Sequence, residues 1–163
     1  LLFAVNVEHG FDFERAQVEF RDGRPIVGRA ETTVRSDRGW QSAEILVEAG
    51  KRYLVTAAGQ FTLADLPKPW VSEANGVSIR YARGRPLGQL QASVLAKSNG
   101  DDPPGSSMLR EVALGNEAVF EAVNSGTLYL RINDDWGELA DNRGTLSVTV
   151  EPIVDAVDQA AGR

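Results

Sequence analysis

The chain has 163 residues, of which 42% are hydrophobic, and its formal net charge is −6. This length and apolar fraction allow one domain to bury a core without cysteines, and the sequence contains none. The negative charge argues against nucleic acid as a partner, and no apolar run approaches the roughly 20 residues that cross a bilayer, so we expect no membrane insertion.

The first 38 residues carry short segments with the alternation of β-strands. The pattern predicts strands over residues 3–7 and 17–20, then a turn at Asp22-Gly23 and a strand over 26–35. His9 is the sole histidine, so we do not expect it to bind a metal. Two interpretations of residues 1–38 stay open: extra strands at a sheet edge, or an ordered linker. The chain does not begin with Met, and we expect it to be part of a longer protein.

The middle of the chain continues the strand pattern. Residues 39–58 predict two strands about a turn at 48–51, and the prolines of residues 66–70 predict a loop of restricted shape. Further strands are predicted over 77–81 and 89–97. We expect Trp40 to pack on the core, whereas Trp70 is either a lid over the core or a platform for a ligand. The segment over residues 80–87 contains three arginines whose simplest use is pairing with surplus acids, namely Arg80, Arg83 and Arg85.

Residues 98–107 predict a loop, and strands follow over 108–114 and 118–123. The last residues, 155–163, are small and polar, and we expect them to fray. Helical periodicity is nearly absent. The fold class predicted is therefore all-β, an antiparallel β-sandwich of jelly-roll or galactose-binding-domain-like type. We divide the chain into an N-terminal part (1–38), the sandwich (39–152) and a tail (153–163).

The sharpest chemical signal lies between two strands near the C-terminus. Leu128, Leu130 and Ile132 alternate in the first strand, and Leu146, Val148 and Val150 alternate in the second. The loop between them collects five oxygen-bearing side chains, namely Asp134, Asp135, Glu138, Asp141 and Asn142. Two interpretations follow. Ca²⁺ takes about 6 to 8 oxygen ligands and would neutralise the repulsion; alternatively, this is a solvated acidic loop whose side chains cap turns.

This segment, INDDWGELADNRGTLSV, resembles the C-terminal calcium- and sugar-binding segment of the PA-IL type of galactophilic bacterial lectin. The family pattern Y-N-D-x-x-G-T-x-x-N-N-x-G-S-x-S-V aligns without a gap. The resemblance implies that calcium is bound by Asp134, Asp141, Asn142 and the carbonyl of Glu138. Glu138 and Asp141 depart from the pattern but still offer oxygen.

A second part of the resemblance lies upstream, where GWQSAEILVEAGKRYLVTAAGQF (Gly39 to Phe61) is similar to a strand-turn-strand of the same family. It implies a further carbonyl ligand at Leu63. The family's His-containing sugar loop is missing around residues 70–76, where Asn75 is a weak candidate for a sugar contact. Trp136 either offers a flat face to a sugar ring or packs against the core.

These observations favour a non-catalytic, calcium-dependent carbohydrate-binding domain of a larger extracytoplasmic bacterial protein. In it, Asp134 and Asp141 are expected to bind both the metal and the sugar. The ligand expected is galactose or another hexose. The alternative is an accessory β-sandwich that has lost sugar binding. An enzyme is disfavoured because acids gathered on a metal stay ionised and because no Ser/His/Asp set or G-x-S-x-G motif is present. The sequence gives no indication of oligomeric state.

Overall fold

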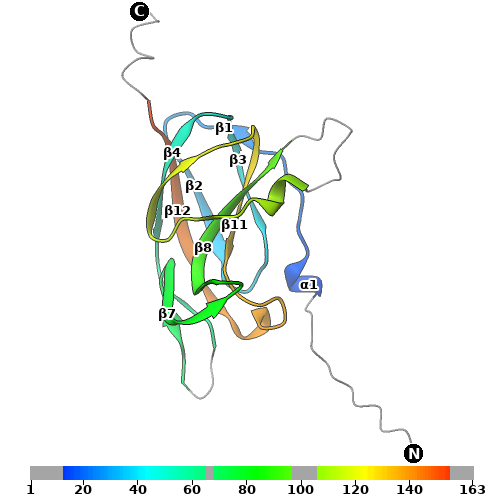
Figure 1. The fold of residues 1–163 in the computed structure, drawn as a ribbon, viewed down its shortest axis with the longest axis vertical. Coiled ribbons are helices and arrows are strands. Elements are labelled where there is room, and N and C mark those ends of the chain that lie inside the picture. Colours follow the sequence, from blue (N-terminus) through cyan, green and yellow to red (C-terminus); the bar gives the residue numbers. More distant parts are fainter. Residues whose placement is uncertain (1–12, 65–67, 97–105, 155–163) are drawn as a thin grey trace, which may run out of the picture.

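The computed structural model describes residues 13–64, 68–96 and 106–154, and it is a sandwich of two six-stranded sheets (Figure 1). The first sheet has the order β1-β3-β11-β8-β7, with β9 paired to β8. Its strands are β1 (Arg24–Pro25), β3 (Gln41–Val47), β7 (Asn75–Ala82), β8 (Arg85–Ala96), β9 (Val112–Ala113) and β11 (Gly126–Ile132). All pairs are antiparallel except β1 with β3.

The second sheet has the order β10-β4-β12-β5-β6, with β2 paired to β12. Its strands are β2 (Ala30–Arg35), β4 (Arg52–Ala58), β5 (Phe61–Thr62), β6 (Val71–Ser72), β10 (Glu117–Glu121) and β12 (Arg143–Pro152). Three short helices complete the described residues, namely α1 (Phe13–Ala16), η1 (Ser106–Leu109) and η2 (Leu139–Asp141). None of the helices in the described ranges has the length and apolar character to span a bilayer. The all-β sandwich expected from the alternation is confirmed.

The core lies between the sheets and is built from the residues that the alternation assigned to it. Leu128, Leu130 and Ile132 of β11 are buried against the inward residues of β12, which are equally inaccessible to water. Across the first sheet, Leu130 pairs with Ala92 and Ile132 with Leu90, so small and large side chains alternate. Full burial of such aliphatic side chains contributes about 1.5–3 kcal/mol each.

At two connections the chain passes from one sheet to the other. The sequence suggested that the strands on either side of each connection pair with one another in a single sheet. β3 lies in the first sheet and β4 in the second, although only residues 48–51 separate them. In the same way, β11 and β12 belong to different sheets. The acidic loop therefore bridges the two layers at one end of the sandwich (Figure 1).

The N-terminal part contributes strands, as one of the two interpretations held. β1 extends the edge of the first sheet beside β3, and β2 pairs with β12, so the sandwich begins before residue 39. Residues between α1 and β1 also cover the outer face of β11. Tyr129 Oη accepts a hydrogen bond from the Arg21 amide, and Thr127 Oγ1 accepts one from the Gly23 amide. Every residue of β11 is buried as a result.

Some predicted strands differ from the structure. Residues 17–20 form no strand, because α1 precedes them and their backbone runs over the sheet instead of pairing in it. The strand predicted over 108–114 shrinks to β9, because η1 occupies its start. The strand predicted at 3–7, His9, the loop at 98–107 up to residue 105, and the tail at 155–163 lie outside the described residues.

Gly126, at the start of β11, has no space for a side chain. A Cβ there would contact the Leu95 carbonyl oxygen and lie 2.8 Å from Ala96 Cα, and both atoms belong to the backbone of paired β8. We expect Gly126→Ala to lower the free energy of unfolding by about 2–3 kcal/mol, since a paired strand must shift. Urea unfolding measures the change, with the exposed Thr145→Ala as control; equal stability of the two variants would contradict the close approach.

Candidate functional site

The candidate site is the loop over residues 133–142, together with the neighbouring segments that hold it. Asn133 anchors its start. The Asn133 backbone amide donates to the Gln89 carbonyl, and its side-chain Nδ2 donates to the carbonyls of Ala82, Arg85 and Pro86 at 2.9–3.2 Å. The side chain of Asn133 thus fastens the loop to the β7–β8 turn, and it is fully buried there.

Asp134 and Asn142, at the two ends of the loop, are brought together. Asn142 Nδ2 donates to Asp134 Oδ2 at 2.8 Å, and Asp134 Oδ1 accepts from the Asp135 amide at 2.7 Å. Both side chains are buried, with exposed fractions of 2% for Asp134 and 1% for Asn142. These are two of the side chains that the family resemblance singled out, and they meet although eight positions separate them.

Ser36 is a member of this group that the sequence did not indicate. It is fully buried after β2, its amide and hydroxyl both donate to the Gly144 carbonyl, and its own carbonyl accepts from Asn142 Nδ2 at 3.0 Å. A serine between a strand and a turn carries no distinctive signal, and only the pairing of β2 with β12 brings it here.

The buried carboxyl of Asp134 has unusual electrostatics. Burial raises its pKa to about 6, since desolvation disfavours the charged form, and the hydrogen bonds from Asn142 and Asp135 offset only part of that effect. The charges of Glu138 and Asp141 raise the pKa further. A carboxylate in this position gains from any cation that comes close.

The other predicted ligands are more open. Glu138 and Asp141 are exposed, and the Glu138 carboxylate is engaged by Arg80 Nη2 at 3.2 and 3.3 Å. Glu138 lies directly before η2, which carries Asp141. Within the described ranges, no three His, Cys, Asp or Glu side chains are arranged to hold a metal. The predicted set does not require three carboxylates, because it combines Asp134 and Asp141 with an amide and backbone carbonyls.

Leu63 lies next to this group through the second sheet. β5 pairs with β12 such that Thr62 faces Arg143, so the same register carried one step further places Leu63 opposite Asn142. The Leu63 side chain is buried and its amide donates to the Trp70 carbonyl. The position is therefore compatible with the carbonyl ligand that the resemblance implied.

Asn75 is placed beside the loop but is engaged elsewhere. It pairs with Gln89, which in turn accepts from the Asn133 amide, so one strand separates Asn75 from the loop. Its Oδ1 accepts from the Asn116 amide, and its own amide donates to Asn116 Oδ1. A sugar contact by this side-chain oxygen would compete with that reciprocal pair.

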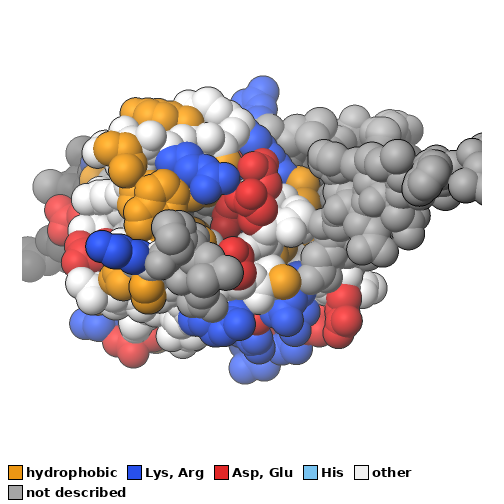
Figure 2. Space-filling model, turned by 90° about the horizontal axis from the view of Figure 1, so that it is seen from below, with side chains coloured by type: hydrophobic (Ala, Val, Ile, Leu, Met, Phe, Trp, Pro, Cys, Tyr) orange, Lys and Arg blue, Asp and Glu red, His pale blue; other side chains and the backbone are white. Residues whose placement is uncertain are grey.

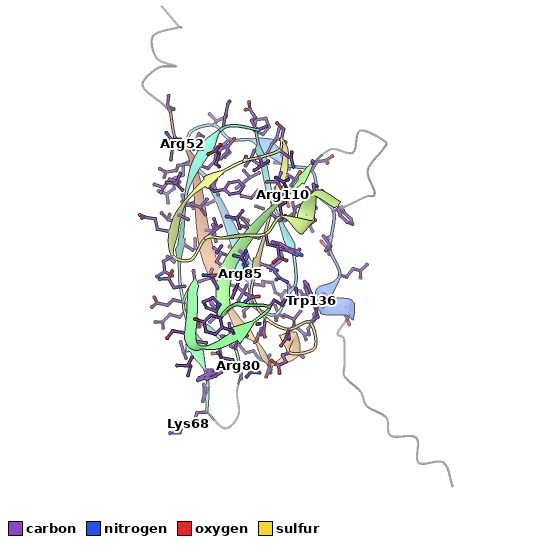
Figure 3. All side chains as sticks on the ribbon, viewed as in Figure 1. Arg52, Lys68, Arg80, Arg85, Arg110 and Trp136 are labelled. Carbon is purple, nitrogen blue, oxygen red and sulfur yellow. The ribbon has the colours of Figure 1, made fainter. Side chains whose placement is uncertain are left out.

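Trp136 is held within a stack of cationic and aromatic groups. The Arg83 Cζ lies 4.3 Å and the Arg131 Cζ 4.9 Å from the centre of its ring, and Arg131 also lies 4.9 Å from the ring of Trp40. Gly39 allows this packing, since a Cβ there would be 2.7 Å from Trp136 Cζ3. Of the two interpretations of Trp136, packing describes its contacts in this structure. Figure 3 shows Trp136, which belongs to the acidic loop, and Arg80 toward the same end of the sandwich.

Arg131 is the largest fully buried side chain among the described residues, and the sequence did not indicate its burial. Burial lowers its pKa to about 10, and the charges of Arg83 and Arg85 lower it further, while Glu111 opposes the shift. Its position in the alternation of β11 assigned it to the outer face, where an arginine is expected to meet water. The N-terminal segment and the two indoles cover that face instead.

The surface at this end of the sandwich is mixed in charge. Figure 2 shows acidic side chains directly beside basic ones, with hydrophobic side chains to one side. A separate groove of about 600 Å³ lies between the N-terminal segment and β2–β3, and its lining includes Trp40, Arg21 and Arg35. Two of its three arginines are already in ion pairs, Arg21 with Glu19 and Glu44 and Arg35 with Asp37, and Arg38 donates to the Glu14 carbonyl.

The residues that converge at the loop fit a hard cation. Asn142 Oδ1 is buried and has no hydrogen-bond donor within the described part of the chain, and the Asp134 carboxylate lies beside it. An orphaned amide oxygen next to a buried carboxylate is the kind of oxygen pair that Ca²⁺ takes.

No protein-family model and no curated protein matches the chain. Among solved structures, the chain is similar to an EclA N-terminal domain described as a PllA-like lectin, with a TM-score of 0.55, 19% identity, and coverage of 76% of this chain and 96% of that one. A periplasmic inhibitor of g-type lysozyme from Aeromonas hydrophila, PliG, gives a TM-score of 0.39 at 9% identity, covering 85% and 99%. A conserved Bacillus anthracis protein of unknown function gives 0.40 at 12% identity, covering 78% and 22%. The first comparison shows a lectin-like fold, and not the PA-IL type in particular.

Proposed function

We propose that this chain is a non-catalytic carbohydrate-binding domain that uses Ca²⁺ held by its acidic loop. The observation that supports this most is the buried pair of Asp134 and Asn142, with its orphaned amide oxygen. The residues that would hold the ion are Asp134, Asn142 and Asp141, with the carbonyls of Glu138 and Leu63. The lectin-like fold is consistent with this proposal.

In this proposal the chain's own residues do three things. Asp134 supplies a charge that burial leaves poorly solvated, so a cation relieves a cost already present in the fold. Ser36 and Asn133 fix the two ends of the loop. Asp134 and Asp141 serve both the ion and the sugar, and the exposed Asp141 accepts hydrogen bonds from ligand hydroxyls. When bound, calcium supplies coordination positions that sugar hydroxyls take from water.

An extracytoplasmic location belongs to the same proposal, because exposed calcium sites of this kind fill at the higher calcium concentrations outside the cytosol. Catalysis is not proposed. The acids that would flank a glycosidic bond are assigned to the metal, where they stay ionised and are poor proton donors.

Removing calcium tests the proposal. We expect a chelator to lower the melting temperature and to abolish binding on a glycan array, with galactosides and other hexosides as the first ligands to score. If calorimetric titration detects no calcium uptake by chelator-treated protein, the proposal is wrong.

A second candidate function is an accessory β-sandwich that keeps the fold and has lost sugar binding. It is favoured by the engagement of Asn75 with Asn116 and of Glu138 with Arg80, since these side chains are occupied by protein groups. The same array separates the two functions. The accessory domain predicts stabilisation by calcium together with no glycan hits.

A further inference from the structure

The guanidinium of Arg131 has more donors than the protein satisfies. Its Nε donates to Gln91 Oε1 at 2.9 Å, and its side chain is 1% exposed. Nη1 and Nη2 have no hydrogen-bond acceptor among the described residues, and neither does Gln91 Nε2. Buried polar groups are almost always hydrogen-bonded in native proteins, so three adjacent donors without acceptors indicate a place for an electron-rich group.

Two acids act on these donors, Glu111 and, through its charge, Asp134. Glu111 Oε1 lies 3.4 Å from Arg131 Nη2 without making a hydrogen bond, and the Glu111 side chain is 27% exposed. Glu111 is thus able to turn toward water, since its backbone is held independently through its carbonyl, which accepts from Arg85 Nη2 at 3.0 Å.

Two more arginines lie around the same position. Arg83 and Gly84 form the two-residue turn between β7 and β8, with positive φ values of 53° and 76°, and this turn directs Arg83 over Trp136. Arg85 begins β8 and contacts Glu111 as described. Their charges both act on Arg131. The buried Arg131 guanidinium therefore lies near two further positive charges in a protein whose net charge is −6. Figure 3 shows Arg85 near the middle of the sandwich and Trp136 closer to its acidic end.

A buried acceptor lies beside the unpaired donors. Gln89 Oε1 has no hydrogen-bond partner in the described ranges, and it is two positions from Gln91 on β8. Residues two apart on a strand share a face and lie about 7 Å apart. A ligand that satisfies both the unpaired donors and Gln89 Oε1 must carry an anionic group for the donors and, a few ångströms away, a hydroxyl that donates to Gln89.

We propose that Arg83, Arg85 and Arg131 form a binding site for the carboxylate of an acidic sugar, a hexuronate, and that Glu111 occupies this site when the sugar is absent. The planar fork of a guanidinium matches a carboxylate in two parallel hydrogen bonds. Arg131 lies between two indole rings, which favours a flat carboxylate over a tetrahedral phosphate or sulfate. A ring hydroxyl donates to Gln89. The assignment of the ligand as a sugar rests on the proposed function, but the site does not use calcium.

The test measures binding of glucuronate and galacturonate to the whole chain by calorimetry in the presence of a chelator, with glucose and galactose as matched neutral sugars. We expect the uronates to bind and the neutral sugars not to bind. Acetate, which lacks hydroxyls, is expected to bind more weakly than either uronate. Equal binding of sulfate and uronate would indicate nonspecific attraction, and no binding of any anion would mean that ordered water alone satisfies the donors. Either result overturns the proposal.

Variants sharpen the test because two of them act in opposite directions. Glu111→Gln removes the competing charge, so we expect it to tighten uronate binding about tenfold while lowering the melting temperature of the free protein. Arg83→Gln and Arg85→Gln are each expected to weaken binding about five- to tenfold. Arg29→Gln is the control, since Arg29 pairs with Glu31 and Glu151 on the second sheet. Unchanged affinity in Glu111→Gln would contradict the displacement of Glu111.

The two proposals fail separately. If calcium is not bound but uronate binds in chelator with the expected response to Glu111→Gln, only the calcium proposal is wrong. If calcium stabilises the chain and supports neutral-sugar binding while uronates have no effect in chelator, only the arginine site is wrong.

Discussion

We expect Asp134→Asn to make the calcium-free protein more stable at pH 7, by about 2 kcal/mol. The buried carboxyl has a pKa of about 6 against 3.8 for the free side chain, so ionising it in the fold costs about 3 kcal/mol. An asparagine avoids this cost. However, asparagine has only one side-chain oxygen, whereas the Asp135 amide and Asn142 Nδ2 each donate to a different oxygen of Asp134. Losing one of these hydrogen bonds costs about 1 kcal/mol, which leaves a net stabilisation of about 2 kcal/mol.

The pH dependence follows from the direction of that shift. Because the pKa of Asp134 is higher in the folded than in the unfolded chain, the folded chain binds more protons between about pH 4 and 6. The contribution of Asp134 to stability is therefore present below pH 4 and is lost as pH rises through 6. Asp37 acts in the opposite direction, since hydrogen bonding by Arg35 lowers its pKa. Both proteins contain Asp37, so its contribution cancels when the free energy of unfolding of Asp134→Asn is subtracted from that of wild type.

Calcium is expected to reverse the order of the two proteins. At a concentration one hundred times the dissociation constant, calcium stabilises wild type by about 2.7 kcal/mol and Asp134→Asn hardly at all. Urea unfolding at pH 4 and pH 7, with calcium and with chelator, measures all four differences. Asp135→Asn is the control, because it makes the same change one residue away at an exposed position. A wild type more stable than Asp134→Asn in chelator at pH 7 would contradict the cost of the buried charge.

The part of the fold that could be predicted from sequence is the part that alternation determines. Leu128, Leu130 and Ile132 are buried because a strand places alternate side chains on one face, and that pattern is local. The assignment of β3 and β4 to different sheets was not predictable in the same way. A four-residue connection fits either a hairpin or a crossing between layers, and only long-range pairing with β11 and with β12 selects the crossing.

The outer face of β11 shows a different limit of alternation. The pattern places Thr127, Tyr129 and Arg131 on the face opposite the core, which is correct, but does not reveal that this face is covered. Contacts such as Tyr129 Oη with the backbone of Glu19 and Arg21 join residues more than one hundred positions apart. No local pattern in residues 17–20 indicates that they run over a sheet.

At the candidate site, Asp134 meets Asn142, and the role of these two residues as metal ligands stays a prediction. The engagement of Glu138 by Arg80 follows from the expected pairing of the arginine segment with surplus acids. The reciprocal bonds of Asn75 with Asn116 were not foreseeable, because they depend on a contact between segments 41 positions apart.

Arg131→Ala is expected to be the most destabilising change at the stack, lowering the free energy of unfolding by about 3–4 kcal/mol. Removing a fully buried side chain from between Trp40 and Trp136 leaves a cavity, and large-to-Ala changes in cores cost about 2–5 kcal/mol. Glu111 adds little to this loss, since it is partly exposed and is able to turn toward water. Urea unfolding, with comparison of the denaturant slopes, measures the effect.

Arg131→Met separates packing from charge. Methionine has a similar length and makes favourable sulfur contacts with both indoles. It removes the two Nη donors that have no acceptors, and it also removes the Nε that donates to Gln91 Oε1. Replacing a buried charge with an apolar side chain of similar volume is often neutral or stabilising, so we expect Arg131→Met to lie within about 1 kcal/mol of wild type. A loss as large as that of Arg131→Ala would mean that the charge itself holds the loop. If Arg131→Met is as stable as wild type and no longer binds glucuronate, the fold does not need the guanidinium, and its burial serves the ligand.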